Sequence, residues 1–119
     1  MKTLFIIIAI LITIYFGYHS YRFAKMDNGL DSRIASGAII LDVRTASEYK
    51  KGHIVGALNM PLGTIQERYV ELDPEKTYIT TCSHGLRSIK VEQILKEKGF
   101  KHVYNGGRWV DLEKTISKL

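Results

Sequence analysis

Cysteine is nearly absent from this chain: Cys82 is the single cysteine among 119 residues. A disulfide within the chain is therefore impossible, and a metal site rich in cysteine is excluded. The four histidines stand far apart and lack the spacing of paired metal ligands. They are His19, His53, His84 and His102. We therefore expect no metal and no other cofactor, and one thiol whose role the rest of the sequence has to explain.

Clusters of positive charge are also missing, although lysine and arginine outnumber aspartate and glutamate by 17 to 12. The basic residues are mixed with acidic ones, as in the segments 67–71 and 96–98. Such mixing is typical of a solvated surface, whereas a nucleic-acid interface gathers its basic residues on one face. We therefore expect no nucleic acid among the partners.

Charge is absent altogether from Thr3 to Tyr21, and most of this stretch is apolar. About 18 uncharged, mostly apolar residues are enough for a candidate membrane helix. A cleaved signal peptide is the alternative, but no small residues mark a cleavage site after the stretch. A core helix would need a polar face, which this segment lacks. We expect residues 1–24 to form an uncleaved membrane anchor, embedded through residues 3–21, and residues 25–119 to form one domain.

Short apolar runs alternate with amphipathic segments in this domain. Strands are expected over residues 38–43, 54–60, 78–81 and 101–104, and helices over 30–36, between Thr45 and Gly52, over 65–72 and 88–98, and from Trp109. The run 38–43 is mostly apolar, which is typical of a strand buried on both faces. Thr45 and Glu48 fit a capping box at a helix start. Strands that alternate with helices predict an α/β fold, with a parallel sheet covered by helices on both faces.

The most informative segment runs from Cys82 to Ser88, between an expected strand and an expected helix. Ligands of an open α/β sheet bind beyond the carboxyl ends of its strands, and Cys82 stands at such an end. The free N–H groups at the start of the following helix favour an anion, here the thiolate of Cys82 or its persulfide. Gly85 lets the loop turn its amides inward, and Arg87 can hold an anionic donor with its planar fork. The alternative is that Cys82 is a small buried apolar residue without chemistry.

Several motifs, in the same order along the chain, resemble the signatures of rhodanese-homology domains. They are Leu41–Arg44 with Glu48–Tyr49, Gly52–Ile54 with Gly56–Ala57 and Asn59–Pro61, the loop Cys82–Ser88, and Tyr104 with Gly106, Gly107 and Trp109. The resemblance extends from about Gly29 to the C-terminus and is strongest to small exported single-domain members. It implies a single rhodanese-like domain, preceded by the N-terminal hydrophobic helix.

The resemblance also assigns roles to individual residues. Cys82 would be the nucleophile, and Arg87 matches the loop arginine of members that use thiosulfate. Asp42 and Arg44 match a pair that supports the site, and we interpret them first as a structural ion pair. The cradle of the sulfur would be the backbone of the remaining loop residues, Ser83, His84, Gly85, Leu86 and Ser88.

The resemblance implies a sulfurtransferase that moves sulfane sulfur from a donor such as thiosulfate to a thiol or cyanide, through a Cys82 persulfide. It also implies a periplasmic or otherwise extracytoplasmic domain, held by the N-terminal segment or released in soluble form by cleavage. A membrane-tethered binding or sensing module with little turnover is one alternative. A phosphatase or arsenate reductase is another, weakened because only four residues, Ser83–Leu86, separate Cys82 from Arg87, and tyrosine-phosphatase-type loops have five.

Overall fold

The computed structural model describes residues 1–24 and 27–119. Its helices are α1 (Lys2–Ala24), α2 (Leu30–Ala35), α3 (Ala46–Lys51), α4 (Ile65–Arg68), α5 (Leu86–Glu97) and α6 (Trp109–Ser117). Its strands are β1 (Ile39–Asp42), β2 (Leu58–Asn59), β3 (Tyr78–Cys82) and β4 (Val103–Arg108). Two short 3₁₀ turns, η1 (Leu62–Thr64) and η2 (Tyr69–Glu71), flank α4.

The four strands form one parallel sheet in the order β2-β1-β3-β4. Asp42 at the end of β1 pairs with Thr81 of β3, and Cys82 pairs with Arg108 of β4. The carboxyl ends of the strands therefore lie together at one end of the sheet. This confirms the predicted α/β fold with a parallel sheet.

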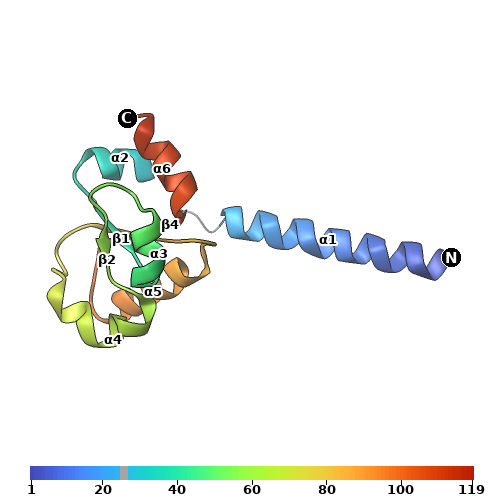
Figure 1. Ribbon diagram of the computed structural model, residues 1–119, viewed down its shortest axis with the longest axis horizontal. Coiled ribbons are helices and arrows are strands. Elements are labelled where there is room, and N and C mark those ends of the chain that lie inside the picture. The colour runs from blue at the N-terminus through green and yellow to red at the C-terminus, as the bar shows by residue number, and fades with distance from the viewer. Residues whose placement is uncertain (25–26) are drawn as a thin grey trace.

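The sheet divides the core into two apolar layers. Successive side chains of a strand point to opposite faces, and Ile40 and Leu41 of β1 accordingly lie in different clusters. Leu41 belongs to the cluster that α4 and α5 cover, and Ile40 to the cluster that α2 and α6 cover. Helices thus bury both faces, as predicted (Figure 1).

Two strands, β2 and β4, differ most from the prediction, and glycines explain both differences. The strand expected over 54–60 is reduced to β2, because Gly56 takes a positive φ of 84° just before it. β4 is longer than expected, since it continues through Gly106 and Gly107, where we expected a turn. A Cβ atom at Gly106 would lie 2.8 Å from the carbonyl oxygen of Thr80. Only glycine therefore lets β4 approach β3 this closely.

Two helices also differ from the prediction at their ends. α5 begins at Leu86, two residues before the expected start, so the loop after Cys82 is shorter. The segment 65–72 forms one turn of α-helix, α4, followed by η2 instead of a single helix. Thr45 and Glu48 form the capping box of α3, as predicted.

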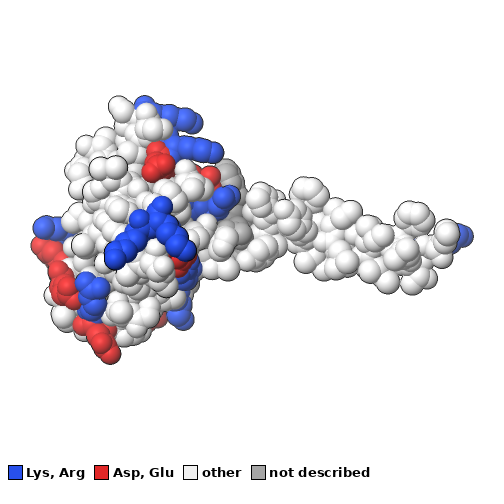
Figure 2. Space-filling view, viewed as in Figure 1, with Lys and Arg blue, Asp and Glu red and all other residues white. Residues whose placement is uncertain are grey.

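α1 projects from the domain as a separate rod (Figure 1). Its segment Lys2–Ser20 has a mean hydropathy of 1.9, and none of it is buried against the rest of the chain. Figure 2 shows no charged side chain on the part of this rod from Thr3 to Ser20. By length and composition α1 is able to cross a membrane, and a signal sequence would meet the same criteria.

The close approach at Gly106 generates a prediction about stability. Gly106→Ala should lower the free energy of unfolding by about 1–3 kcal/mol, because the new methyl group overlaps β3. Gly63→Ala is the matched control, since a Cβ at Gly63 meets nothing within 4 Å. Urea unfolding of the full chain in a mild detergent, followed by circular dichroism, measures both. Equal effects at the two positions would contradict this account of β4.

Candidate active site

Cys82 is the last residue of β3, and it is only 1% exposed. The short connection Ser83–Gly85 leads from it into α5. Gly85 adopts the left-handed conformation, with a φ of 86°, which a residue with a Cβ rarely takes. This reversal places the sulfur beneath the start of a 12-residue helix.

Two backbone amides point at the sulfur of Cys82. The N–H of Gly85 donates to Sγ at 3.0 Å, and the N–H of Ser88 donates to it at 3.4 Å. Of the loop residues that the sequence analysis named for the cradle, Gly85 and Ser88 contact Sγ through their amides, and the role of the loop as a cradle of sulfur stays a prediction. The dipole of α5 adds positive potential at the same point. Both N–H groups and the helix start therefore present partial positive charge to the sulfur.

The Ser88 hydroxyl is the third polar group beside the sulfur, at 3.6 Å from Sγ. Its shortest contact is with Asn105 Oδ1 at 2.7 Å. Because Oδ1 can only accept, the hydroxyl proton is used there and Ser88 Oγ is left to accept from a protonated thiol. Gly107 also donates its N–H to Asn105 Oδ1, at 3.0 Å, which fixes the orientation of the amide group. Asn105 was missed in the sequence analysis, because it follows the strand expected over 101–104 and precedes two glycines, where a polar residue is typical of a turn.

Arg87 forms a two-pronged ion pair with Glu48 of α3. Nη1 lies 2.7 Å from Oε1, and Nη2 lies 2.9 Å from Oε2. The hydroxyl of Ser83 donates to the same carboxylate at 2.9 Å. We had interpreted Glu48 as a capping residue and as part of a family motif, without a role at the site, so its reach to the cysteine loop is a new element of the site. The role of Arg87 as a ligand of the sulfur donor stays a prediction, and its fork is occupied by Glu48.

The ion pair changes the protonation of its carboxyl group. The Arg87 guanidinium, above all, holds the pKa of Glu48 well below its ordinary value of 4.5, with further help from Thr45 and Ser83 and against the effect of burial. Glu48 in turn raises the pKa of Arg87. Glu48 is therefore an anion throughout the physiological pH range, and it stands at the edge of the candidate active site.

Asp42 and Arg44 form a buried ion pair beneath α3. Arg44 Nη2 lies 2.7 Å from Asp42 Oδ2, and Nε donates to both carboxylate oxygens. The same Nη2 donates to the carbonyl oxygen of Gly52 at 2.7 Å, at the end of α3. The guanidinium also lies 4.8 Å from the ring centre of Trp109. This geometry fits the structural role that we expected for the pair.

The remaining loop residues form the outer rim of the site. His84 is exposed, and Leu86 is 49% exposed although it is apolar. Arg108 follows on the neighbouring strand, also exposed, at 3.8 Å from Asp111. The sulfur is thus enclosed from below by the sheet and α5, and the rim around it is partly apolar and partly basic.

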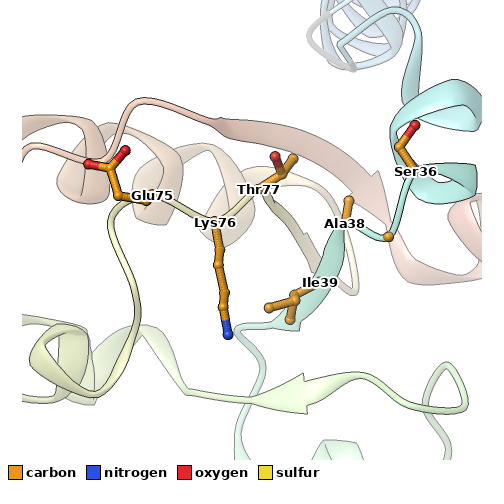
Figure 3. A pocket seen from close by; sticks show the side chains of 7 residues that line it. Ser36, Ala38, Ile39, Glu75, Lys76 and Thr77 are labelled. Carbon is orange, nitrogen blue, oxygen red and sulfur yellow. The ribbon is translucent and has the colours of Figure 1, made fainter.

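A hollow of about 400 Å³ lies at the other end of the sheet. Figure 3 shows its lining, which comes from the segment before β1 and from the turn before β3: Ser36, Gly37, Ala38, Ile39, Glu75, Lys76 and Thr77. Because these residues lie at the amino ends of β1 and β3 and Cys82 is at the carboxyl end of β3, the hollow is separate from the thiol site.

The arrangement of a central parallel strand, a terminal cysteine and a loop folded over its sulfur matches a known family. The Rhodanese-like domain family matches residues 26–108, which include the whole sheet. The chain belongs to the rhodanese family. The sequence resemblance is therefore confirmed over most of the domain.

Curated rhodanese relatives carry sulfurtransferase names. The thiosulfate sulfurtransferase PspE of Escherichia coli is 36% identical over 74 residues, which are 60% of this chain and 71% of PspE. The thiosulfate sulfurtransferase GlpE of Coxiella burnetii is 40% identical over 67 residues, which are 56% of this chain and 63% of GlpE. A tRNA sulfurtransferase of Thermoplasma acidophilum is 35% identical over 94 residues, 79% of this chain but only 18% of that protein. The chain thus spans less than two thirds of the last two relatives. Their names support a sulfurtransferase kind of function.

Solved rhodanese structures show the same fold. An Escherichia coli rhodanese with anions has a TM-score of 0.59 and 34% identity, over 63% of this chain and 91% of its own. The reduced CoADR-RHD of Bacillus anthracis has a TM-score of 0.62 and 32% identity, over 74% of this chain and 16% of its own. The likeness extends over the domain that holds Cys82.

The Glu48–Arg87 pair predicts a pH-dependent stability. Glu48→Gln should lower the free energy of unfolding by about 1 kcal/mol near pH 7, a modest value because solvent screens a pair that is about one third exposed. The pKa of Glu48 is lowered in the folded chain, so the stabilisation is complete above the ordinary pKa of 4.5 and is lost as the pH falls below it. Urea unfolding near neutral pH and near pH 3 measures this difference. Glu67→Gln, at an exposed position of α4, is the control, and a pH-independent effect of Glu48→Gln would contradict the assignment.

Proposed function

We propose that the chain transfers sulfur from a donor such as thiosulfate to a thiol or cyanide, and that Cys82 carries the sulfur as a persulfide. The observation that supports this most is the position of Sγ, 3.0 and 3.4 Å from the amides of Gly85 and Ser88 at the start of α5. N–H groups that the backbone already holds in place stabilise a negative sulfur without any rearrangement of the protein. A thiolate and a persulfide both need that stabilisation.

The first half of the reaction loads Cys82. The thiolate attacks the outer sulfur of thiosulfate, and a new S–S bond forms on Cys82. The S–S bond of thiosulfate breaks at the same time, and its electron pair leaves with sulfite. Such covalent catalysis divides the transfer into two steps with ping-pong kinetics.

The second half unloads the persulfide. An acceptor thiolate or cyanide attacks the outer sulfur, the bond between this sulfur and Cys82 breaks, and the electron pair returns to Cys82 as the thiolate. The amides of Gly85 and Ser88 then receive the same negative sulfur that they held at the start. The Ser88 hydroxyl stays bonded to Asn105 and keeps the start of α5 in place.

Arg87 is the group that we assign to recognition of the donor. Thiosulfate is a dianion, and the guanidinium fork suits its oxygens. Because Glu48 occupies this fork, thiosulfate would have to displace the carboxylate or share the arginine with it. Glu48 would then set how tightly a donor binds, since it competes for the same positive charge.

The alternatives have less support from the site. A binding or sensing module would not need a buried thiol with two amides directed at it. A phosphatase-type loop has five residues between its cysteine and its arginine, whereas Arg87 follows Cys82 after four residues. We therefore favour sulfur transfer over both.

We also propose that α1 anchors the domain to a membrane, with the domain on the periplasmic or extracytoplasmic side. The uncharged stretch of α1 from Thr3 to Ser20 supports this proposal, and a periplasmic domain released by cleavage is the alternative.

The full chain should transfer sulfur from thiosulfate to cyanide with parallel double-reciprocal lines. Treatment with thiosulfate alone should add the mass of one sulfur atom to the protein, which mass spectrometry detects. Cys82→Ser should abolish both, because no other thiol exists in the chain. Transfer that survives in Cys82→Ser would refute the proposal, as would hydrolysis of p-nitrophenyl phosphate by the unchanged chain.

Arg87→Ala should raise the KM for thiosulfate by about ten- to hundredfold, which corresponds to the loss of about 1.5–3 kcal/mol from a charge-assisted contact. The matched control is Arg68→Ala, because Arg68 also pairs with a glutamate through two nitrogens but lies on α4. Steady-state kinetics at varied thiosulfate separates KM from kcat. Unchanged constants in Arg87→Ala would show that the guanidinium does not meet the donor.

A further inference from the structure

The point where the chain enters the domain lies close to the candidate active site. The N–H of Asp27 donates to the carbonyl oxygen of Asn105 at 3.1 Å, and the Asp27 carboxylate accepts the N–H of Asn105 at 2.7 Å. Asp27 is therefore fixed beside the middle of β4. Asn105 is the same residue whose side chain holds Ser88 beside Cys82.

The distance between the anchor and the thiol is short. Only two residues separate the end of α1 from Asp27, so Ala24 lies within about 11 Å of Asp27. Asn105 of β4 pairs with Thr80 of β3, which precedes Cys82 by two residues. The path from Asp27 to Cys82 therefore crosses two strand spacings and then follows β3 for about two residues. These steps place Cys82 within about 25 Å of the end of α1.

The course of the chain shows which end of the sheet faces the anchor. After Asp27 the chain runs through α2 to Ser36, which lines the hollow at the amino ends of the strands. In Figure 1 the yellow segment that leads into β3 lies on the side of the domain away from α1. β3 therefore directs its carboxyl end, with Cys82, toward the side from which α1 leaves.

The rim of the site has the chemistry of a surface that meets lipid headgroups. Leu86 is half exposed, and the basic residues are Arg87 and Arg108. The nearby carboxylates of Glu48 and Asp111 are paired with these two arginines, so the rim carries little net charge of either sign. A half-exposed apolar side chain on such a rim can enter the headgroup region of a membrane.

We infer that the catalytic end of the domain lies against the membrane surface, and that Cys82 passes its sulfur to an acceptor thiol held at that surface. The inference rests on the proposed sulfur transfer and on α1 as an anchor. The acceptor thiolate attacks the outer sulfur of the Cys82 persulfide. The S–S bond on Cys82 breaks, Cys82 leaves as the thiolate, and the acceptor becomes the persulfide, with no net oxidation or reduction.

The orientation is tested with the full chain in vesicles that contain anionic lipid. A fluorescent label is placed on one cysteine in the Cys82→Ser background, either at Leu86→Cys on the rim or at Glu75→Cys beside the hollow. A quencher carried on lipid headgroups should quench the rim label at least about threefold more strongly, because the two positions lie at opposite ends of the strands. Equal quenching, or stronger quenching at residue 75, overturns the inference.

The acceptor is tested with two thiols at equal total concentration, one soluble and one attached to a lipid headgroup. The unchanged chain should transfer sulfur faster to the lipid thiol. A variant with about 30 glycine and serine residues inserted after Ala24 gains roughly 30 Å of reach. Its ratio of lipid-thiol to soluble-thiol rates should fall about fivefold, while its rate with the soluble thiol stays unchanged. No preference for the lipid thiol, or a preference that survives the insertion, overturns the inference.

The remaining outcomes separate this inference from the proposals beneath it. If the chain is inactive with the soluble thiol as well, the proposed sulfur transfer fails and the inference fails with it. If an alkaline wash removes the full chain from the vesicles, the anchor fails, again with the inference. If the chain transfers sulfur to the soluble thiol and stays in the vesicles, but the label at residue 86 is not quenched more strongly than the label at residue 75, only the inference is refuted.

Discussion

The buried ion pair of Asp42 and Arg44 is the interaction on which the rest of the site depends. Its two charges are almost fully excluded from water, so removal of either partner would leave an isolated buried charge, at a cost of about 3–5 kcal/mol. Arg44 also bonds the carbonyl oxygens of Glu48 and Gly52 and thereby fixes α3 on the end of β1. α3 in turn carries the Glu48 side chain to Arg87. The ion pair at the end of β1 therefore determines, through α3 and Glu48, where Arg87 can lie.

A second set of contacts, from β4 and α5, holds the groups that surround the sulfur of Cys82. Asn105 lies in β4, and its Oδ1 accepts hydrogen bonds from both the Ser88 hydroxyl and the Gly107 N–H. Ser88 then aligns its own N–H with Sγ. The close packing of β4 on β3, which Gly106 permits, keeps Asn105 within reach. The cradle of the thiol thus depends on two neighbouring strands and one helix, and not on the loop sequence alone.

Much of this arrangement could be predicted from the sequence, because it depends on local patterns. The apolar run 38–43, the capping residues of α3 and the position of Cys82 between a strand and a helix all give short-range signals. The partner of Arg87 could not be predicted in this way, since Glu48 lies far from it in the chain and its capping role already explained it. The length of β4 was missed because two glycines usually indicate a turn, whereas here one of them permits close packing. Contacts between residues far apart in the chain, and the steric fit of neighbouring strands, cannot be predicted from the periodic pattern of apolar residues.

The single cysteine has a consequence for how the cycle can end. Many thiol enzymes discharge a sulfur or oxygen adduct with a second cysteine of their own, which attacks and forms a disulfide. This chain has no second thiol, so in the proposed cycle a loaded Cys82 could not be reset from within the molecule. The lifetime of the proposed persulfide would then be set by the supply of acceptors around it. Under the proposed function the domain would also serve as a reservoir of sulfur, which stays loaded while acceptors are scarce and is unloaded when they arrive.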